Sequence, residues 1–121
     1  MLKKILLIED YAPTAKMIEE VLKIAGYEMS TAINGTSGLQ KAIEEKPGLI
    51  LLDIMLPGID GLEVCKRLKA DPATAKIPVI AVSVKSSAED IKKGLAAGVD
   101  EYIAKPFDPQ KLIEAISRRL R

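Results

Sequence analysis

Short apolar runs alternate with segments of helical periodicity along the whole chain. Five runs have the length and composition of strands: residues 4–8, 28–32, 49–52, 79–82 and 102–104. Most of them are too uniformly apolar to have a solvated face, which is typical of parallel strands covered on both sides. Between them, apolar residues recur at the spacing of amphipathic helices. Five strand-helix units in succession predict an α/β fold with a parallel sheet.

Polar residues at the expected helix starts support this division. Thr36 is expected to cap the second helix after the Asn-Gly turn at 34–35. Ser87 with Asp90 forms a capping-box pattern for the fourth helix, and Asp108 followed by proline begins the fifth. The last helix is expected to end with the chain at residue 121.

The predicted arrangement of these units is a doubly wound five-stranded sheet in the order 2-1-3-4-5 with five helices, the flavodoxin-like topology. A length of 121 residues fits one hydrophobic core. The chain has no internal repeat and no linker-like stretch, so residues 1–121 are expected to form a single domain.

Composition and charge exclude several classes of function. A net charge of +1 gives no electrostatic basis for binding nucleic acid or an anionic membrane. The apolar run at 5–8 is too short for a signal peptide or a membrane span, so a cytoplasmic location is expected. The chain has no histidine and only one cysteine, Cys65, which excludes histidine-activated nucleophiles, histidine-ligated metals and internal disulfides.

Three carboxylates follow two of the predicted strands. Glu9 and Asp10 come directly after the first, and Asp53 comes directly after the third. The predicted order makes these strands neighbours at the edge where doubly wound sheets bind ligands, so the three acids should converge. Carboxylates at such short range repel one another without a cation, and oxygen ligands suit Mg²⁺. The sequence therefore predicts a Mg²⁺ site.

A hydroxyl and a cation are expected at the same edge. Ser83 ends the fourth strand, and Lys105 ends the fifth, followed by proline. A serine hydroxyl can donate to a phosphoryl oxygen, and an ammonium group can offset charge on a transferred phosphoryl group. Each residue alone would be an ordinary strand-end residue, but the full set indicates phosphate chemistry.

Four motifs, spread over nearly the whole chain, carry a resemblance to a known family. They are Ile-Glu-Asp at 8–10, Leu-Leu-Asp-Ile-Met-Leu-Pro-Gly-Ile-Asp-Gly at 51–61, Ile-Pro-Val-Ile-Ala-Val-Ser at 77–83 and Ala-Lys-Pro-Phe at 104–107. In this ordered set the chain resembles the receiver domains of response regulators in two-component signalling. The resemblance implies a phosphorylation-activated switch, with self-catalysed phosphoryl transfer and slow self-dephosphorylation, rather than an enzyme.

The resemblance also implies a role for each site residue. Asp53 would accept the phosphoryl group, while Ser83 and Lys105 would bind its oxygens. The expected metal ligands are Asp10, Asp53, the Met55 backbone carbonyl and, through water, Glu9.

Three further positions follow from the same comparison. Tyr102 matches the aromatic residue whose rotation reports the switch; the alternative is a half-buried strand tyrosine with its hydroxyl in water. Val84 stands where the family usually has alanine or glycine, so we expect it to slow both small phosphodonors and water. Met55 and Lys85 occupy positions that tune dephosphorylation.

The expected partners follow from the absence of histidine. The phosphohistidine donor must be a separate histidine kinase or phosphotransfer protein, docking near Pro13, Thr14, Met17 and Phe107. Phosphorylation would then alter a surface made of the fourth helix, fifth strand and fifth helix, which contacts a downstream protein. A stand-alone regulator is the main expectation; a receiver excised from a longer regulator with a DNA-binding or enzymatic output is the alternative.

Other classes of protein fit less well. A haloacid dehalogenase-like phosphatase also uses a strand-end aspartate with Mg²⁺, but it needs a second aspartate two residues on, where Met55 stands. An FMN carrier of the flavodoxin type would not place acids beside a phosphate. A pseudo-receiver that binds partners without phosphate would not need the intact acid, serine and lysine set.

Overall fold

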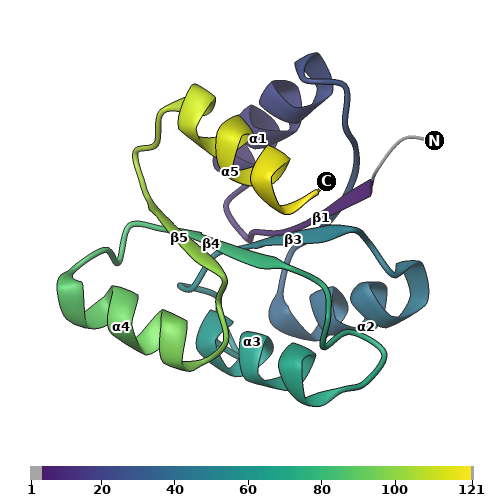
Figure 1. The fold of residues 1–121 in the computed structure, drawn as a ribbon, viewed down its shortest axis with the longest axis vertical. Coiled ribbons are helices and arrows are strands. Elements are labelled where there is room, and N and C mark those ends of the chain that lie inside the picture. The colour runs from purple at the N-terminus through teal and green to yellow at the C-terminus, as the bar shows by residue number, and fades with distance from the viewer. Residues whose placement is uncertain (1–3, 121) are drawn as a thin grey trace.

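The computed structural model describes residues 4–120. Its strands and helices alternate from β1 to α5 (Figure 1). In chain order they are β1 (Lys4–Ile8), α1 (Ala12–Ile24), β2 (Glu28–Ala32), α2 (Gly35–Glu45), β3 (Leu49–Leu52), α3 (Gly61–Ala70), β4 (Val79–Ser83), α4 (Ala88–Ala96), β5 (Glu101–Ala104) and α5 (Pro109–Arg119). All strand pairs are parallel, and the order β2-β1-β3-β4-β5 confirms the predicted topology.

Helices cover both faces of the sheet, as the apolar strands require. Helices α1 and α5 lie on one face, and α2, α3 and α4 lie on the other (Figure 1). Alternate strand residues divide between the two layers: Ile5 and Leu7 pack towards α1 and α5, whereas Leu6 and Ile8 pack into the other core. Both sets are fully buried, so the inner strands have no solvated face.

The register of the strands brings the ends of β1, β3, β4 and β5 to one edge. Ile8, the last residue of β1, pairs with Leu52, the last of β3, so Glu9 and Asp53 emerge side by side. Ser83 closes β4 and pairs with Ala104, the residue before Lys105. The candidate site residues therefore leave neighbouring strands in the same direction.

The helix starts match the predictions with one correction. Ser87 and Asp90 form the expected capping box, and Asp108 caps α5. The cap of α2 is Asn34, whose side chain accepts a 2.8 Å hydrogen bond from the Ser37 amide, and not Thr36. Asn34 has the extended backbone that a cap requires, whereas Thr36 already lies inside the helix.

The ends of the fold add two observations. Helix α5 ends at Arg119, and residue 121, where the last helix was expected to end, lies outside the described residues. None of the helices formed by residues 4–120 combines the length and apolarity needed to cross a membrane.

Candidate phosphoacceptor and metal site

The three predicted carboxylates converge at the carboxyl edge of the sheet. One oxygen from each of Glu9, Asp10 and Asp53 lies within 4.8 Å of the others. Glu9 and Asp53 are buried, and Asp10 is exposed. The cluster is thus open to solvent on one side and enclosed on the other, an arrangement that a partly hydrated cation can enter.

Backbone groups fix the buried acids in place. The Asp53 amide donates to the Ile8 carbonyl across β1 and β3 at 3.0 Å. The Met55 amide donates to Asp53 Oδ1 at 3.0 Å, and the Tyr11 amide donates to Glu9 Oε2 at 3.3 Å. Each carboxylate therefore has one oxygen held by the main chain and one directed elsewhere.

Gly61 explains why the loop after β3 can pass so close to the acceptor. A Cβ atom at this position would lie 2.5 Å from the Asp53 carbonyl oxygen. Any side chain there would displace the backbone that carries Asp53. The Pro-Gly-Ile-Asp-Gly stretch at 57–61 therefore needs a glycine at its end to pass beside the acid cluster.

Lys105 binds both buried acids. Its Nζ lies 2.6 Å from Glu9 Oε1 and 3.2 Å from Asp53 Oδ2. The lysine side chain is 13% exposed, so these charge-assisted hydrogen bonds are shielded from water. The ammonium group thus occupies the place beside Asp53 where it could offset charge on an incoming phosphoryl group.

The environment shifts the pKa of both members of the closest pair. Burial raises the pKa of Glu9 to about 7; Lys105 opposes the shift, and the neighbouring Asp53 adds to it. Burial lowers the pKa of Lys105, but the hydrogen bond that it donates to Glu9 and the charge of Asp53 outweigh this effect, so that the pKa of Lys105 is raised. Lys105 therefore stays charged at neutral pH while Glu9 is close to its titration point.

The donor set fits a divalent cation. Two buried carboxylates and one exposed carboxylate face a single ammonium group, which leaves an excess of negative charge when all the acids are ionised. Hard oxygen ligands of this kind, open to water on one side, suit Mg²⁺. Among residues 4–120, Glu9, Asp10 and Asp53 make up the group of acids close enough to share an ion.

Ser83 and Tyr102 are linked through the backbone of Lys85. Ser83 is fully buried, and its Oγ accepts a 3.2 Å hydrogen bond from the Lys85 amide. The Tyr102 hydroxyl donates to the Lys85 carbonyl. The ring is half-buried as expected for a strand tyrosine, but its hydroxyl has a protein partner rather than water alone.

The positions expected to tune chemistry lie at the rim. The side chains of Met55 and Val84 are 48% and 61% exposed. Neither fills the core, so both are available to contact a phosphodonor or to limit the approach of water.

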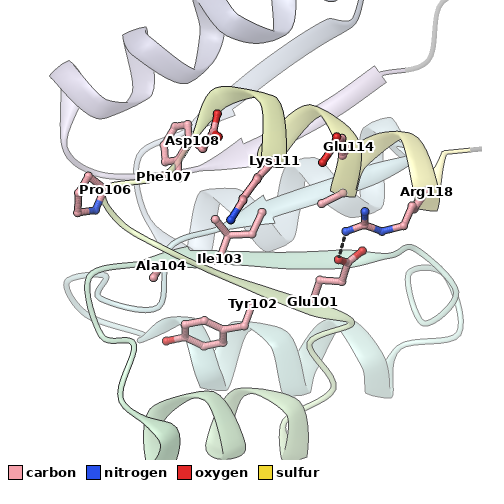
Figure 2. A pocket seen from close by; sticks show the side chains of 11 residues that line it. Glu101, Tyr102, Ile103, Ala104, Pro106, Phe107, Asp108, Lys111, Glu114 and Arg118 are labelled. Carbon is pink, nitrogen blue, oxygen red and sulfur yellow. Dashed lines mark hydrogen bonds and ion pairs between the residues drawn. The ribbon is translucent and has the colours of Figure 1, made fainter.

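The expected docking residues share one side of the molecule. Pro13 and Met17 are exposed on α1, whereas Thr14 is half-buried. Phe107 packs partly against the core beneath α1 and α5 and lines a groove of about 650 Å³ between β5 and α5 (Figure 2). The acid cluster does not line this groove.

The sequence did not predict the contacts that backbone groups make at the site. The Lys85 carbonyl and the Tyr11 amide act through the backbone, which no residue type signals. Gly94 of α4 contacts the Tyr102 ring, but a glycine inside a helix pattern has several explanations.

Comparisons with known proteins agree with this geometry. Residues 5–117 match the family model described as the response regulator receiver domain. The phosphate regulon transcriptional regulatory protein PhoB of Pseudomonas aeruginosa is 42% identical over 119 residues, covering 98% of this chain and 52% of that protein. The chain thus spans about half the length of the curated relatives it matches.

Solved structures give the same result. A CheY-like response regulator receiver domain protein from Methanospirillum hungatei superposes with a TM-score of 0.91 at 32% identity, covering 99% of this chain and 94% of that one. The receiver domain of the sensor histidine kinase PA1611 from Pseudomonas aeruginosa, solved with a magnesium ion coordinated in its active site cleft, has a TM-score of 0.92 at 28% identity. It covers 99% of this chain and 98% of that one.

Proposed function

The chain belongs to the response regulator receiver domain family, and on that basis we propose that Asp53 is its phosphoacceptor. The observation that supports this assignment is the position of Asp53 between Lys105 and two further carboxylates at the carboxyl edge of the sheet. Asp53 is buried yet borders the open side of the cluster, so a donor can reach it while the surrounding charges stay fixed.

The reaction is an in-line transfer from a phosphohistidine. An oxygen of the Asp53 carboxylate attacks phosphorus, an O–P bond forms, the N–P bond breaks and the donor imidazole keeps the electron pair. Lys105 lies beside the accepting carboxylate and offsets charge on the transferred oxygens, and the Ser83 hydroxyl can turn from Lys85 to donate to one of them. Catalysis of this kind is positioning with charge neutralisation.

The metal site would be formed by Asp10 and Asp53 directly, by the Met55 carbonyl, and by Glu9 through water. When bound, Mg²⁺ supplies charge neutralisation between the acid cluster and the phosphoryl oxygens. The carboxylates of this chain hold that charge at the sheet edge, and Lys105 screens the two buried ones from each other until then.

The partners follow from the same chemistry. The donor is a histidine kinase or histidine phosphotransfer protein, which docks over Pro13, Thr14, Met17 and Phe107. The signal leaves through the surface of α4, β5 and α5, which contacts a downstream protein. We also propose that the protein acts in the cytoplasm and that residues 1–121 form one domain.

Intact-mass spectrometry after incubation with Mg²⁺ and acetyl phosphate tests the proposal. A gain of one phosphoryl group is expected in the wild type. The gain should be absent in Asp53→Asn and in a sample with a metal chelator. The matched control is Asp60→Asn, another aspartate in the same loop that caps α3 and lies outside the acid cluster. Phosphorylation that persists in Asp53→Asn would refute the assignment.

If acetyl phosphate gives no gain in the wild type, beryllofluoride separates the two explanations. Binding of beryllofluoride would show an intact site from which small donors are excluded by Val84. No binding would identify a pseudo-receiver and overturn the proposed function.

A further inference from the structure

Helix α4 buries less side-chain surface against the sheet than its neighbour α3 does. Within α4 (Ala88–Ala96), the buried residue is a glycine, Gly94. Helix α3, on the same face of the sheet, buries the side chains of Val64, Cys65 and Leu68. Burial of apolar side chains is what holds a helix in place, and glycine contributes almost none of it. Because of this, α4 can change position at lower cost than its neighbour.

The Tyr102 ring packs against α4 at Gly94. A Cβ atom at position 94 would lie 2.8 Å from Tyr102 Cε2 and 2.9 Å from Cδ2, and its next neighbour, Val99 Cγ2, would be 4.0 Å away. Figure 2 shows the ring extending from β5 towards α4, away from α5. The ring thus occupies the space that any side chain at position 94 would need.

Two consecutive hydrogen bonds connect the same ring to Ser83, which ends β4 at the edge of the sheet that carries the acid cluster. The Tyr102 hydroxyl donates to the Lys85 carbonyl, and the Lys85 amide donates to Ser83 Oγ. If the Ser83 side chain rotates so that its oxygen moves towards a phosphoryl group, its hydrogen bond from the Lys85 amide would break. A shift of the loop before α4 would therefore move the partner of the Tyr102 hydroxyl, and with it the ring that lies against Gly94.

We propose that Gly94 is a positioning residue for Tyr102: the missing side chain creates the place on α4 where the ring sits with its hydroxyl on the Lys85 carbonyl. This inference rests on the proposed switch and specifies how it reaches α4. A methyl group at position 94 would displace the ring rather than the backbone, because a tyrosine side chain can rotate about χ1 and helix backbone cannot yield as cheaply.

A purely structural role for Gly94 predicts the opposite effect on stability. Alanine is a better helix former than glycine, so Gly94→Ala should raise the Tm if nothing clashes. We expect it to lower the Tm in the wild-type background and to raise it in the Tyr102→Ala background, where the ring is absent. A rise in both backgrounds would overturn the proposal.

Fluorine NMR of protein labelled with 3-fluorotyrosine measures the ring directly. The chain has three tyrosines, and Tyr102→Phe assigns the Tyr102 resonance. Gly94→Ala should shift this resonance in the resting protein and abolish its response to Mg²⁺ with beryllofluoride. Lys92→Ala, a substitution at an exposed position of the same helix, should leave both unchanged. The rate of phosphorylation by acetyl phosphate should stay within about twofold of wild type, because Gly94 lies outside the acid cluster.

A Tyr102 resonance in Gly94→Ala that matches the wild type at rest and on activation would refute the positioning role. If the wild type does not respond to beryllofluoride, the proposed function fails instead. The resting resonance and the two-background Tm comparison would still decide whether Gly94 positions the ring.

Discussion

Lys105 Nζ lies closer to Glu9 Oε1 than to Asp53 Oδ2, at 2.6 Å against 3.2 Å. Before any cation or phosphoryl group enters, the main partner of the lysine is therefore the deeply buried acid and not the proposed acceptor. Entry of a cation has to change this distribution of charge. In the proposed switch, Lys105 would then redirect its hydrogen bonds towards a phosphoryl group on Asp53.

Removing the lysine should destabilise the metal-free protein in a pH-dependent way. Lys105→Met leaves the Glu9 and Asp53 carboxylates without their cation, which costs about 3 kcal/mol at pH 8, as for other broken buried ion pairs. At pH 6 the cost should be smaller, because Glu9 then takes up a proton and no longer carries an unpaired buried charge. Urea unfolding with a chelator at the two pH values measures this, and an equal loss at both would contradict it.

Binding of Mg²⁺ should strengthen as the pH rises through neutrality. Burial raises the pKa of Glu9 to about 7, so this acid must lose its proton in the range where most carboxyls are already ionised. If a single proton is released, affinity rises by up to about tenfold per pH unit below 7. Calorimetric titration with Mg²⁺ between pH 6 and 8 should show the rise, and Glu9→Gln should flatten it.

The same shift predicts how stability depends on pH without metal. The folded protein holds the Glu9 proton more tightly than the unfolded chain, whose pKa is the ordinary 4.5. The Glu9 contribution to stability is therefore fully present below 4.5 and is lost as the pH rises towards 7. Mg²⁺ should restore more stability at pH 8 than at pH 6, as thermal unfolding with and without the metal can establish.

Val84→Ala should accelerate both formation and loss of the acyl phosphate. The Val84 side chain is exposed at the rim after Ser83, where its branched carbon can crowd small molecules that approach Asp53. We expect both the rate with acetyl phosphate and the rate of hydrolysis to rise by roughly three- to tenfold, which corresponds to about 1 kcal/mol of crowding. Unchanged rates in the variant would show that Val84 does not guard the site.

Asp100 should matter for stability far more than a surface ion pair. Its Oδ2 accepts hydrogen bonds from the Val79 amide at 2.8 Å and from Lys69 at 3.2 Å, at the end of the sheet away from the acids. Asp100→Ala removes the acceptor of the Val79 amide and leaves Lys69 with backbone carbonyls alone, which should cost about 2 to 3 kcal/mol. Glu63→Gln, which breaks the exposed pair with Arg67, should cost less than about 0.5 kcal/mol in the same urea titration.

The strands and the acid cluster could be predicted because their causes are local. Uniformly apolar runs predict buried parallel strands, and the acids that follow them must share an edge once the order of the sheet is known. Glu9 and Asp53 meet as expected for that reason. The convergence needed no knowledge of side-chain conformation.

The remaining features depend on backbone angles and on tertiary neighbours. Asn34 and Thr36 both suit a helix cap, and only the extended backbone at residue 34 distinguishes them. The partner of the Tyr102 hydroxyl is a carbonyl whose position comes from a loop, and the ring contact with Gly94 comes from the packing of α4. No residue type signals either one.

The contact between Lys105 and Glu9 joins residues 96 positions apart, from the last strand to the first. An incomplete chain still being synthesised can already contain Glu9, Asp10 and Asp53 but lacks the cation that balances them until β5 has taken its place at the edge of the sheet. The proposed phosphoryl transfer to Asp53 is therefore expected only after the final strand has formed. A nascent chain that lacks β5 is therefore expected to be inactive as a phosphoacceptor, even though all three acids are already present.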